Sequence, residues 1–165
     1  MTFKKYPILV LSFLITMFLD TAVLPKWNLF HIVPFLMLAL TLAAEQVFSI
    51  QTAIVIGALG GLFEDLLCEN MIGLTPALLL LAAVAYVKLP KDSDTKPVVL
   101  GLYFAILAFG VELMRALVSK VIGMRFDLLN ALLYGMLPRS LLTGLWGMLW
   151  MVLFKPLLKR QVDAA

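Results

Sequence analysis

Two adjacent carboxylates, Glu64 and Asp65, end an apolar, glycine-rich segment of bilayer-crossing length. An acidic side chain in such a segment is costly and generally marks a proton site, a cation site or a contact with a partner's arginine. The alternative is that both lie at the lipid headgroups and only end the helix. Because adjacent helix residues point about 100° apart, at most one of them faces a bundle interior. We expect Asp65 to face protein and Glu64 to be solvated.

A second pair of opposite charges, Glu112 and Arg115, lies near the middle of another apolar segment. An isolated charge at that depth costs roughly 2.5–3.5 kcal/mol on insertion scales. Their spacing of three residues places both on one helix face, where an intrahelical ion pair can neutralise them. A functional role is the alternative. A third interpretation pairs Arg115 with Asp65 on another helix, although the depths of these two residues argue against it.

Two further charged residues, Asp20 and Arg139, lie toward the outer ends of the first and last apolar segments. A buried Asp20 requires a partner, and Arg139 is a candidate. Arg139 can instead extend its side chain to the lipid headgroups. The sequence leaves both possibilities open.

No group of residues in the sequence has the composition of a catalytic or cofactor site. His31 is the single histidine and Cys68 the single cysteine, so a zinc ion lacks the ligands it needs. We interpret His31 as interfacial and Cys68 as a small residue near a helix end. There is neither a glycine-rich phosphate loop with lysine nor a nucleophile–base arrangement. We therefore expect no catalytic residue, no metal and no cofactor.

Glycines indicate where helices approach each other closely. Gly57 and Gly61 have the four-residue spacing of small residues that is typical of membrane helix contacts. We interpret them as a packing face, within this protein or against a partner. Gly73 opens the next apolar segment after a short polar break. The later segments carry further glycines of this kind, namely Gly101, Gly110, Gly135, Gly144 and Gly147.

The elements that position these residues are membrane helices. Hydrophobic residues make up 63% of the 165-residue chain and charged residues 14%, against about 45–50% and 25% in soluble domains. Apolar runs recur at about the length of a bilayer crossing. We expect an all-α integral membrane protein, a single domain over residues 1–165 with a bundle of about six transmembrane helices. The expected segments are 6–23, 30–44, 50–67, 73–87, 98–122 and 137–157.

Prolines and short polar stretches set the expected limits of these segments. Pro25 closes the first segment, and Pro34 lies in the first turns of the second, where a missing N–H is tolerated. Residues 127–136 are expected to form a separate interfacial or re-entrant helix before the last segment. The proline- and aspartate-rich stretch 88–97 is expected to be a cytoplasmic loop.

The distribution of basic residues predicts the orientation. With six crossings, eight basic residues share the side of both termini, against three or four on the other side, so both termini should be cytoplasmic. The net charge of +3 comes from residues between apolar runs, so we expect no nucleic-acid binding. The first set is Lys4, Lys5, Lys88, Lys91, Lys96, Lys155, Lys159 and Arg160. The second is Lys26, Lys120 and Arg125, with Arg139 at its edge.

The string GALGGLFEDLLCENMIGLTPALLLLAAVAY over residues 57–86 resembles the signature of the rod-shape-determining MreD family. That family shows a G-x-x-x-G-L-x-x-D-L-L core, a short polar break, a glycine and an apolar helix. The matching residues are Gly57, Gly61, Leu62, Asp65, Leu66, Leu67 and Gly73. Chain length, hydropathy and the basic C-terminal tail agree as well. The chain departs from the family at Pro34-Phe35, where the family often has proline followed by aspartate.

The resemblance implies a non-enzymatic scaffold of the cell-elongation machinery in the bacterial inner membrane. Such a protein binds MreC. It also helps to connect MreB filaments to peptidoglycan synthesis by a RodA-type glycosyltransferase and a class B penicillin-binding protein, which maintains rod cell shape. Membrane lipids are the other expected neighbours. The hairpin with Gly57, Gly61, Asp65 and Gly73 is then the expected packing or partner interface.

Two other functions are weighed against the scaffold. MreD-like proteins are similar in fold to the substrate-binding S components of energy-coupling-factor transporters, which implies a vitamin or metal in an external cavity. Such a cavity needs several convergent polar groups, and the sequence offers few (Asn28, Asn70, Thr75, Asp65 and Arg139). An enzyme that acts on a lipid phosphate needs clustered acids or several basic residues, which do not occur at motif spacing.

Overall fold

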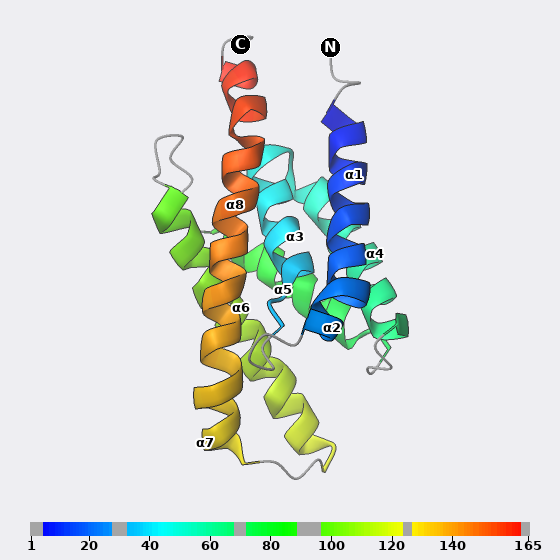
Figure 1. The fold of residues 1–165 in the computed structure, drawn as a ribbon, viewed down its shortest axis with the longest axis vertical. Helices are drawn as coiled ribbons and strands as arrows, with labels where there is room; N and C mark the ends of the chain where they lie inside the picture. The colour runs from blue at the N-terminus through cyan, green and yellow to red at the C-terminus, as the bar shows by residue number, and fades with distance from the viewer. Residues whose placement is uncertain (1–4, 28–32, 68–71, 89–96, 124–126, 163–165) are drawn as a thin grey trace.

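The computed structural model describes residues 5–27, 33–67, 72–88, 97–123 and 127–162, which are helical almost throughout and include no strand (Figure 1). The expectation of an all-α protein is therefore confirmed. The elements, with η marking π-helical segments, are α1 (Lys5–Phe18), η2 (Leu19–Val23), α2 (Leu24–Trp27), α3 (Leu36–Val47), α4 (Ile50–Leu67), α5 (Leu74–Val87), α6 (Pro97–Val121), α7 (Leu128–Asn130), η4 (Ala131–Met136) and α8 (Leu137–Val162).

The helices run alternately up and down, and both chain termini lie at the same end of the molecule (Figure 1). The first rod passes without a break through α1, η2 and α2, and the last through α7, η4 and α8. The described residues therefore form six helical rods. At the end opposite the termini, α6 and the start of the last rod extend beyond the other helices (Figure 1).

A π-helical segment carries the last rod through Pro138. The N–H of Leu137 donates to the carbonyl of Leu132, five residues back, at the end of η4. Because a proline ring displaces the carbonyl four residues before it, a wider π turn at this point keeps the helix continuous. The expectation of a separate helix over residues 127–136 was therefore wrong. From residue 128 onward, this stretch belongs to the same rod as α8.

Pro25 and Pro34 also lie differently from what the sequence predicted. The first rod does not end at Pro25, because η2 precedes it in the same way and the helix continues to Trp27. Pro34 lies before its helix instead of within it. Its carbonyl accepts the N–H of Leu36 at 3.1 Å, and α3 starts at that residue.

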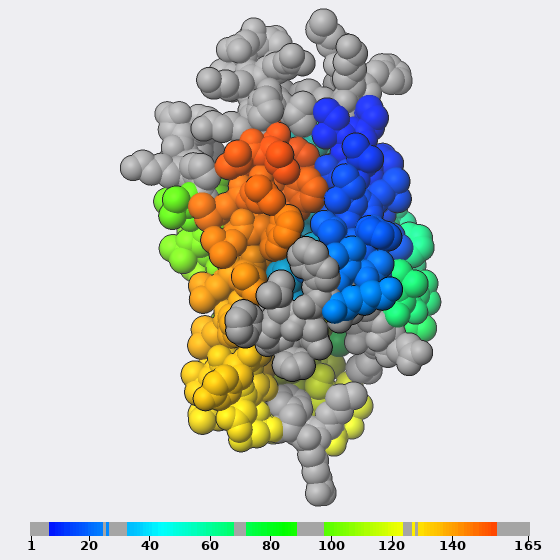
Figure 2. All heavy atoms as spheres, in the orientation of Figure 1, coloured from blue at the N-terminus to red at the C-terminus, as the bar shows by residue number. Residues whose placement is uncertain are grey.

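Helix α3 forms the centre of the bundle. All of its residues except Gln46 are buried, as expected for a helix that is apolar nearly all round. It contacts α1, α4, α5, α6 and α8. Figure 2 shows how α1 and α8 cover it on one face. The other helices bury one side against it and leave leucine, isoleucine and valine side chains exposed on the outside.

Three helices are long and apolar enough to cross a membrane, namely 50–67, 98–121 and 131–154. The apolar helices 7–23, 36–47 and 74–87 are shorter. At 1.5 Å per residue, the 12 residues of α3 extend about 18 Å, less than the roughly 30 Å of a bilayer's hydrocarbon core. The described residues thus include three helices that could cross a membrane, which is consistent with a helical membrane protein.

Candidate functional site

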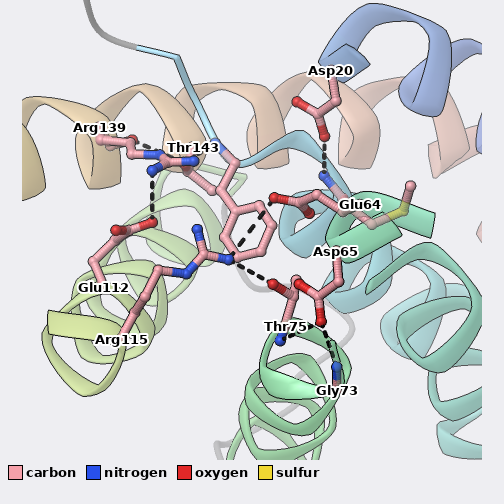
Figure 3. Close-up of polar contacts among 11 residues, drawn as sticks. Asp20, Glu64, Asp65, Gly73, Thr75, Glu112, Arg115, Arg139 and Thr143 are labelled. Atoms are coloured by element: carbon pink, nitrogen blue, oxygen red, sulfur yellow. Dashed lines mark hydrogen bonds and ion pairs between the residues drawn. The ribbon is translucent and has the colours of Figure 1, made fainter. Parts of the chain in front are cut away.

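Six charged side chains, which the sequence scatters over most of the chain, meet near the start of α3 and α5 (Figure 3). We refer to them as the charged cluster. They come from four of the six rods. The members are Asp20 of η2, Glu64 and Asp65 of α4, Glu112 and Arg115 of α6, and Arg139 of α8.

Asp65 caps the N-terminus of α5. Its Oδ2 accepts the backbone N–H groups of Gly73 at 2.8 Å and of Thr75 at 3.2 Å. Gly73 has a φ of +94°, a left-handed conformation that glycine adopts without steric cost. Asp65 is 1% exposed, so the expectation that it faces protein is confirmed. The start of α5 is thereby tied to the end of α4.

Asp20 caps α3 in the same way, but from a different rod. Its Oδ2 accepts the N–H of Met37, the second residue of α3, at 3.1 Å (Figure 3). A carboxylate at a helix N-terminus is stabilised by the free N–H groups and by the helix dipole. Asp20 therefore has a partner other than the expected Arg139, because η2 directs it to the start of α3.

Arg115 extends from α6 to α4 and α5. Its guanidinium donates to Thr75 Oγ1 at 2.8 Å and lies 3.9 Å from Glu64. The candidate partner Asp65 is occupied by the α5 cap, so the acid that faces Arg115 is its neighbour. Glu64 is 9% exposed. The expectation that it is solvated was wrong. Glu64 is buried beside the guanidinium of Arg115, which comes from another helix.

Glu112 pairs with Arg139 of α8, whose guanidinium lies 3.3 Å from its carboxylate. The expected intrahelical pair with Arg115 is thus replaced by two pairs between helices. Glu112 is 7% exposed. The guanidinium of Arg139 is therefore paired inside the bundle. The alternative that it extends to the lipid headgroups was wrong.

An aromatic ring lies beside both arginines. The guanidinium carbons of Arg115 and Arg139 lie 5.2 Å and 5.7 Å from the centroid of the Phe35 ring, within the range of cation–π attraction. The backbone N–H of Phe35 donates to Thr143 Oγ1 of α8 at 2.9 Å. Phe35 is 1% exposed. Sequence analysis noted this residue only as a departure from the family pattern and missed its contacts.

The charges of the cluster are largely balanced within the chain. Asp20 and Asp65 each face a helix N-terminus, which carries about half a positive charge, and the other two carboxylates each face a guanidinium. This leaves a residual negative charge of about one. Among the described residues, no three His, Cys, Asp or Glu side chains are grouped so that they could hold a metal ion.

The predicted glycine face of α4 packs inside the bundle. A Cβ on Gly57 would lie 3.2 Å from Thr41 of α3 and 3.4 Å from Leu79 of α5. On Gly61 it would lie 2.6 Å from the backbone N and Cα of Pro76, closer than atoms can approach without a shift. These two glycines therefore allow α4 to contact its neighbours in this chain.

The later glycines divide into two groups. A Cβ on Gly144 of α8 would lie 2.6 Å from the carbonyl oxygen of Gly101 of α6, so these residues bring the two longest helices together. Gly110 and Gly135 have no such neighbour within 4 Å. Glycine spacing in the sequence does not distinguish the two groups.

Glu45 of α3 is a buried acid that sequence analysis did not consider. It is 4% exposed and lies toward the opposite end of α3 from the charged cluster. The signal was present, since Glu45 is the single charged residue in the apolar stretch that forms α3. Beside it, Gln46 accepts a hydrogen bond from the hydroxyl of Tyr86 at 3.0 Å.

Four residues that the sequence analysis considered lie outside the described residues, namely Asn28, His31, Cys68 and Asn70.

The described residues form an all-helical bundle with three candidate membrane spans, and buried charge contacts join its helices. No family model, curated protein or solved structure matches the chain significantly.

Proposed function

We propose that this chain is a non-enzymatic membrane scaffold of the MreD type. It would bind MreC and help to connect MreB filaments to the RodA-type glycosyltransferase and its penicillin-binding protein, and so maintain rod shape. The observation that carries the proposal is that the charged side chains of the cluster contact other helices of the same chain. Asp20, Asp65, Glu112 and both arginines contact other elements of the same chain at 2.8–3.3 Å, so they join helices, which supports a structural role.

The hairpin that resembles the family signature has a corresponding role in this chain. Asp65 holds the turn at Gly73, and Gly57 and Gly61 allow α4 to lie against α3 and α5. Four of the seven residues on which the resemblance rests are thus ones that the fold needs, whereas the three matching leucines are exposed. This supports a protein that acts through helix contacts.

We further propose six membrane crossings with both termini in the cytoplasm of a bacterial cell. The alternation of six rods and the shared end of the termini support an even number of crossings (Figure 1). The short helix α3 is surrounded by longer rods, so lipid need not match its length. The excess of basic residues at the terminal side supports the cytoplasmic assignment.

A substrate-binding transporter component is the second candidate. The convergence of charged and hydroxyl side chains from five rods favours it, since a ligand site needs such groups. The contacts that these groups already make with one another weigh against it. An occupied site would require several of these pairs to open.

Affinity purification of the tagged chain from its native cells in mild detergent, with mass spectrometry, tests the proposal. Recovery of MreC, the glycosyltransferase or the penicillin-binding protein supports the scaffold. Asp65→Ala should then recover less partner than wild type while still inserting in the membrane, and Gly110→Ala is its control. Recovery of ATPase subunits with a transporter T component, or of a bound vitamin, would move the assignment to transport.

A further inference from the structure

Helix α5 is shorter than a bilayer crossing and lies at the surface of the bundle. Its 14 residues extend about 21 Å, against roughly 30 Å for the hydrocarbon core of a bilayer. Unlike the buried α3, it has one face exposed along its length, formed by Ala77, Leu81, Val84 and Val87. Because this face is exposed, the surroundings in the membrane have to match the length of α5 itself.

Two contacts determine how α5 lies along α6. Near one end, Thr75 of α5 accepts a hydrogen bond from Arg115 of α6 at 2.8 Å. Near the other end, the rings of Tyr86 and Phe104 lie edge to face with their centroids 5.4 Å apart. The two contacts are separated by 11 residues on α5 and by 11 residues on α6. The two helices therefore run antiparallel and side by side in one register.

Helix α6 extends beyond α5 at both ends. It continues for six residues after Arg115 and starts seven residues before Phe104, whereas α5 extends one residue beyond each contact. The differences of five and six residues correspond to about 8 Å and 9 Å. Exposed apolar side chains continue to both ends of α6, with Val98 at 65% and Val121 at 87% exposure. Helix α6 thus suits a full bilayer, and α5 does not.

Helix α4, which packs against α5, has an equally short apolar surface. Its first exposed residue, Gln51, is polar, and its exposed large apolar side chains lie between Ile54 and Leu67, over about 20 Å. On the last rod, which packs against α6, such side chains lie between Leu129 and Leu153, over about 36 Å. The apolar surface of the bundle is therefore much shorter on the side of α4 and α5.

We propose that α4 and α5 lie in a locally thinned bilayer with a hydrocarbon core of about 20 Å, while α6 and the last rod lie in a bilayer of ordinary thickness. The inference rests on the six crossings proposed above, one of which is α5. A bilayer accommodates a short span by becoming thinner around it. Tilt does not replace the thinning, because a tilted helix extends less far across the membrane than an upright one.

Lipid fits this surface better than the transmembrane helix of a partner. A helix that crosses a full bilayer is about 30 Å long, so about a third of it would have no counterpart on α4 and α5. Lipid chains adjust to the local length of a protein surface. Lys88, directly after α5, is exposed and can extend its charge to the headgroups of a thinned bilayer.

Spin labels at two matched positions test the thinning. Val87 of α5 and Leu102 of α6 lie at the level of the Tyr86–Phe104 contact and are exposed, at 43% and 57%. Each is replaced by a labelled cysteine in a Cys68→Ser chain, in dioleoylphosphatidylcholine vesicles, and collisions with oxygen and with a nickel chelate report the depth. We expect the label of Val87→Cys at the headgroups. The label of Leu102→Cys should lie about 6 Å deeper, since α6 stays apolar for four further residues toward Val98.

Equal depths of the two labels overturn the inference, because they show a bilayer of one thickness around both helices. Shielding of the label of Val87→Cys from both reagents also overturns it, because a second copy of the chain would then cover this surface. Lys88→Leu lengthens the apolar end of α5 and should move the label of Val87→Cys toward the depth found for Leu102→Cys. An unchanged depth in that variant also counts against the thinning.

A third label separates this inference from the proposed function. Leu81, midway along α5, is 54% exposed, and the label of Leu81→Cys should be deeper than that of Val87→Cys if α5 crosses the membrane. If it is not deeper, the crossing fails and the thinning fails with it. If it is deeper while Val87→Cys and Leu102→Cys have equal depths, the thinning alone fails. The scaffold function is tested by partner recovery from native cells, and its failure leaves these vesicle measurements valid.

Discussion

Arg139 of α8 and Glu112 of α6 form an ion pair at 3.3 Å, although Arg115 lies only one turn from Glu112 on the same helix. Because Glu112 contacts α8, Arg115 is free to reach α4 and α5. The two arginines thus connect α6 to three neighbouring helices. Both also lie beside the ring of Phe35, which places the segment before α3 between them.

Replacement of Arg139 by glutamine should strongly destabilise the bundle. It leaves Glu112, which is 7% exposed, without its cation, and loss of one partner of a buried pair costs about 3–5 kcal/mol. Unfolding in mixed detergent micelles measures the change in free energy. Arg139→Lys should lose less, since it keeps the charge. The double variant Arg139→Gln, Glu112→Gln should be more stable than the sum of the single losses predicts, and strictly additive losses would contradict the pairing.

Removal of the Asp65 carboxylate should weaken the hairpin between α4 and α5. Asp65→Ala loses two hydrogen bonds to backbone N–H groups at the start of α5, so we expect a loss near the upper end of capping effects, about 2 kcal/mol. Asp127→Ala is the matched control, because Asp127 accepts the N–H of Leu129 at an exposed position where water can replace it. Equal losses in the two variants would show that burial of the cap is unimportant.

The helices could largely be predicted from the sequence, because apolar runs and their polar limits are local features. The third expected segment and α4 have the same limits, 50 and 67. Burial of Asp65 was predicted correctly, but the premise that at most one of the two adjacent acids faces the interior was wrong, because Glu64 is buried as well. The continuation of the first and last rods past Pro25 and Pro138 was not predicted, because a π turn does not change the hydrophobic pattern.

The partners within the charged cluster could not be predicted, for a different reason. Ion pairing between helices depends on their rotation and contact, which an apolar helix surface does not specify. Asp20 and Arg139 are 119 residues apart in sequence and were matched on expected depth alone. In the structure, Asp20 instead accepts a backbone N–H at the start of α3, and Arg139 forms an ion pair with Glu112. A charge has several possible partners in sequence, and packing selects among them.

Gly61→Ala should destabilise the bundle, whereas Gly110→Ala should not. A Cβ on Gly61 would lie 2.6 Å from the backbone of Pro76, which cannot move aside as a flexible side chain can, so we expect an overpacking loss of about 1–3 kcal/mol. Gly110 also lies in a helix but has no neighbour within 4 Å of a Cβ. Thermal unfolding of both variants in the same detergent measures the difference. A stable Gly61→Ala protein would contradict the close contact of α4 with α5.

The proposed orientation predicts which end of α6 a membrane-impermeant reagent can reach. In a Cys68→Ser chain, Asp127→Cys should react with an impermeant maleimide on intact spheroplasts, and Lys88→Cys should react only after lysis. Both native side chains are exposed and lie beyond opposite ends of α6, so accessibility within the protein does not bias the comparison. Because an excess of basic residues favours the cytoplasmic side, Lys88 should be inside. The reverse pattern would invert the topology, and labelling of both from outside would exclude α6 as a membrane crossing.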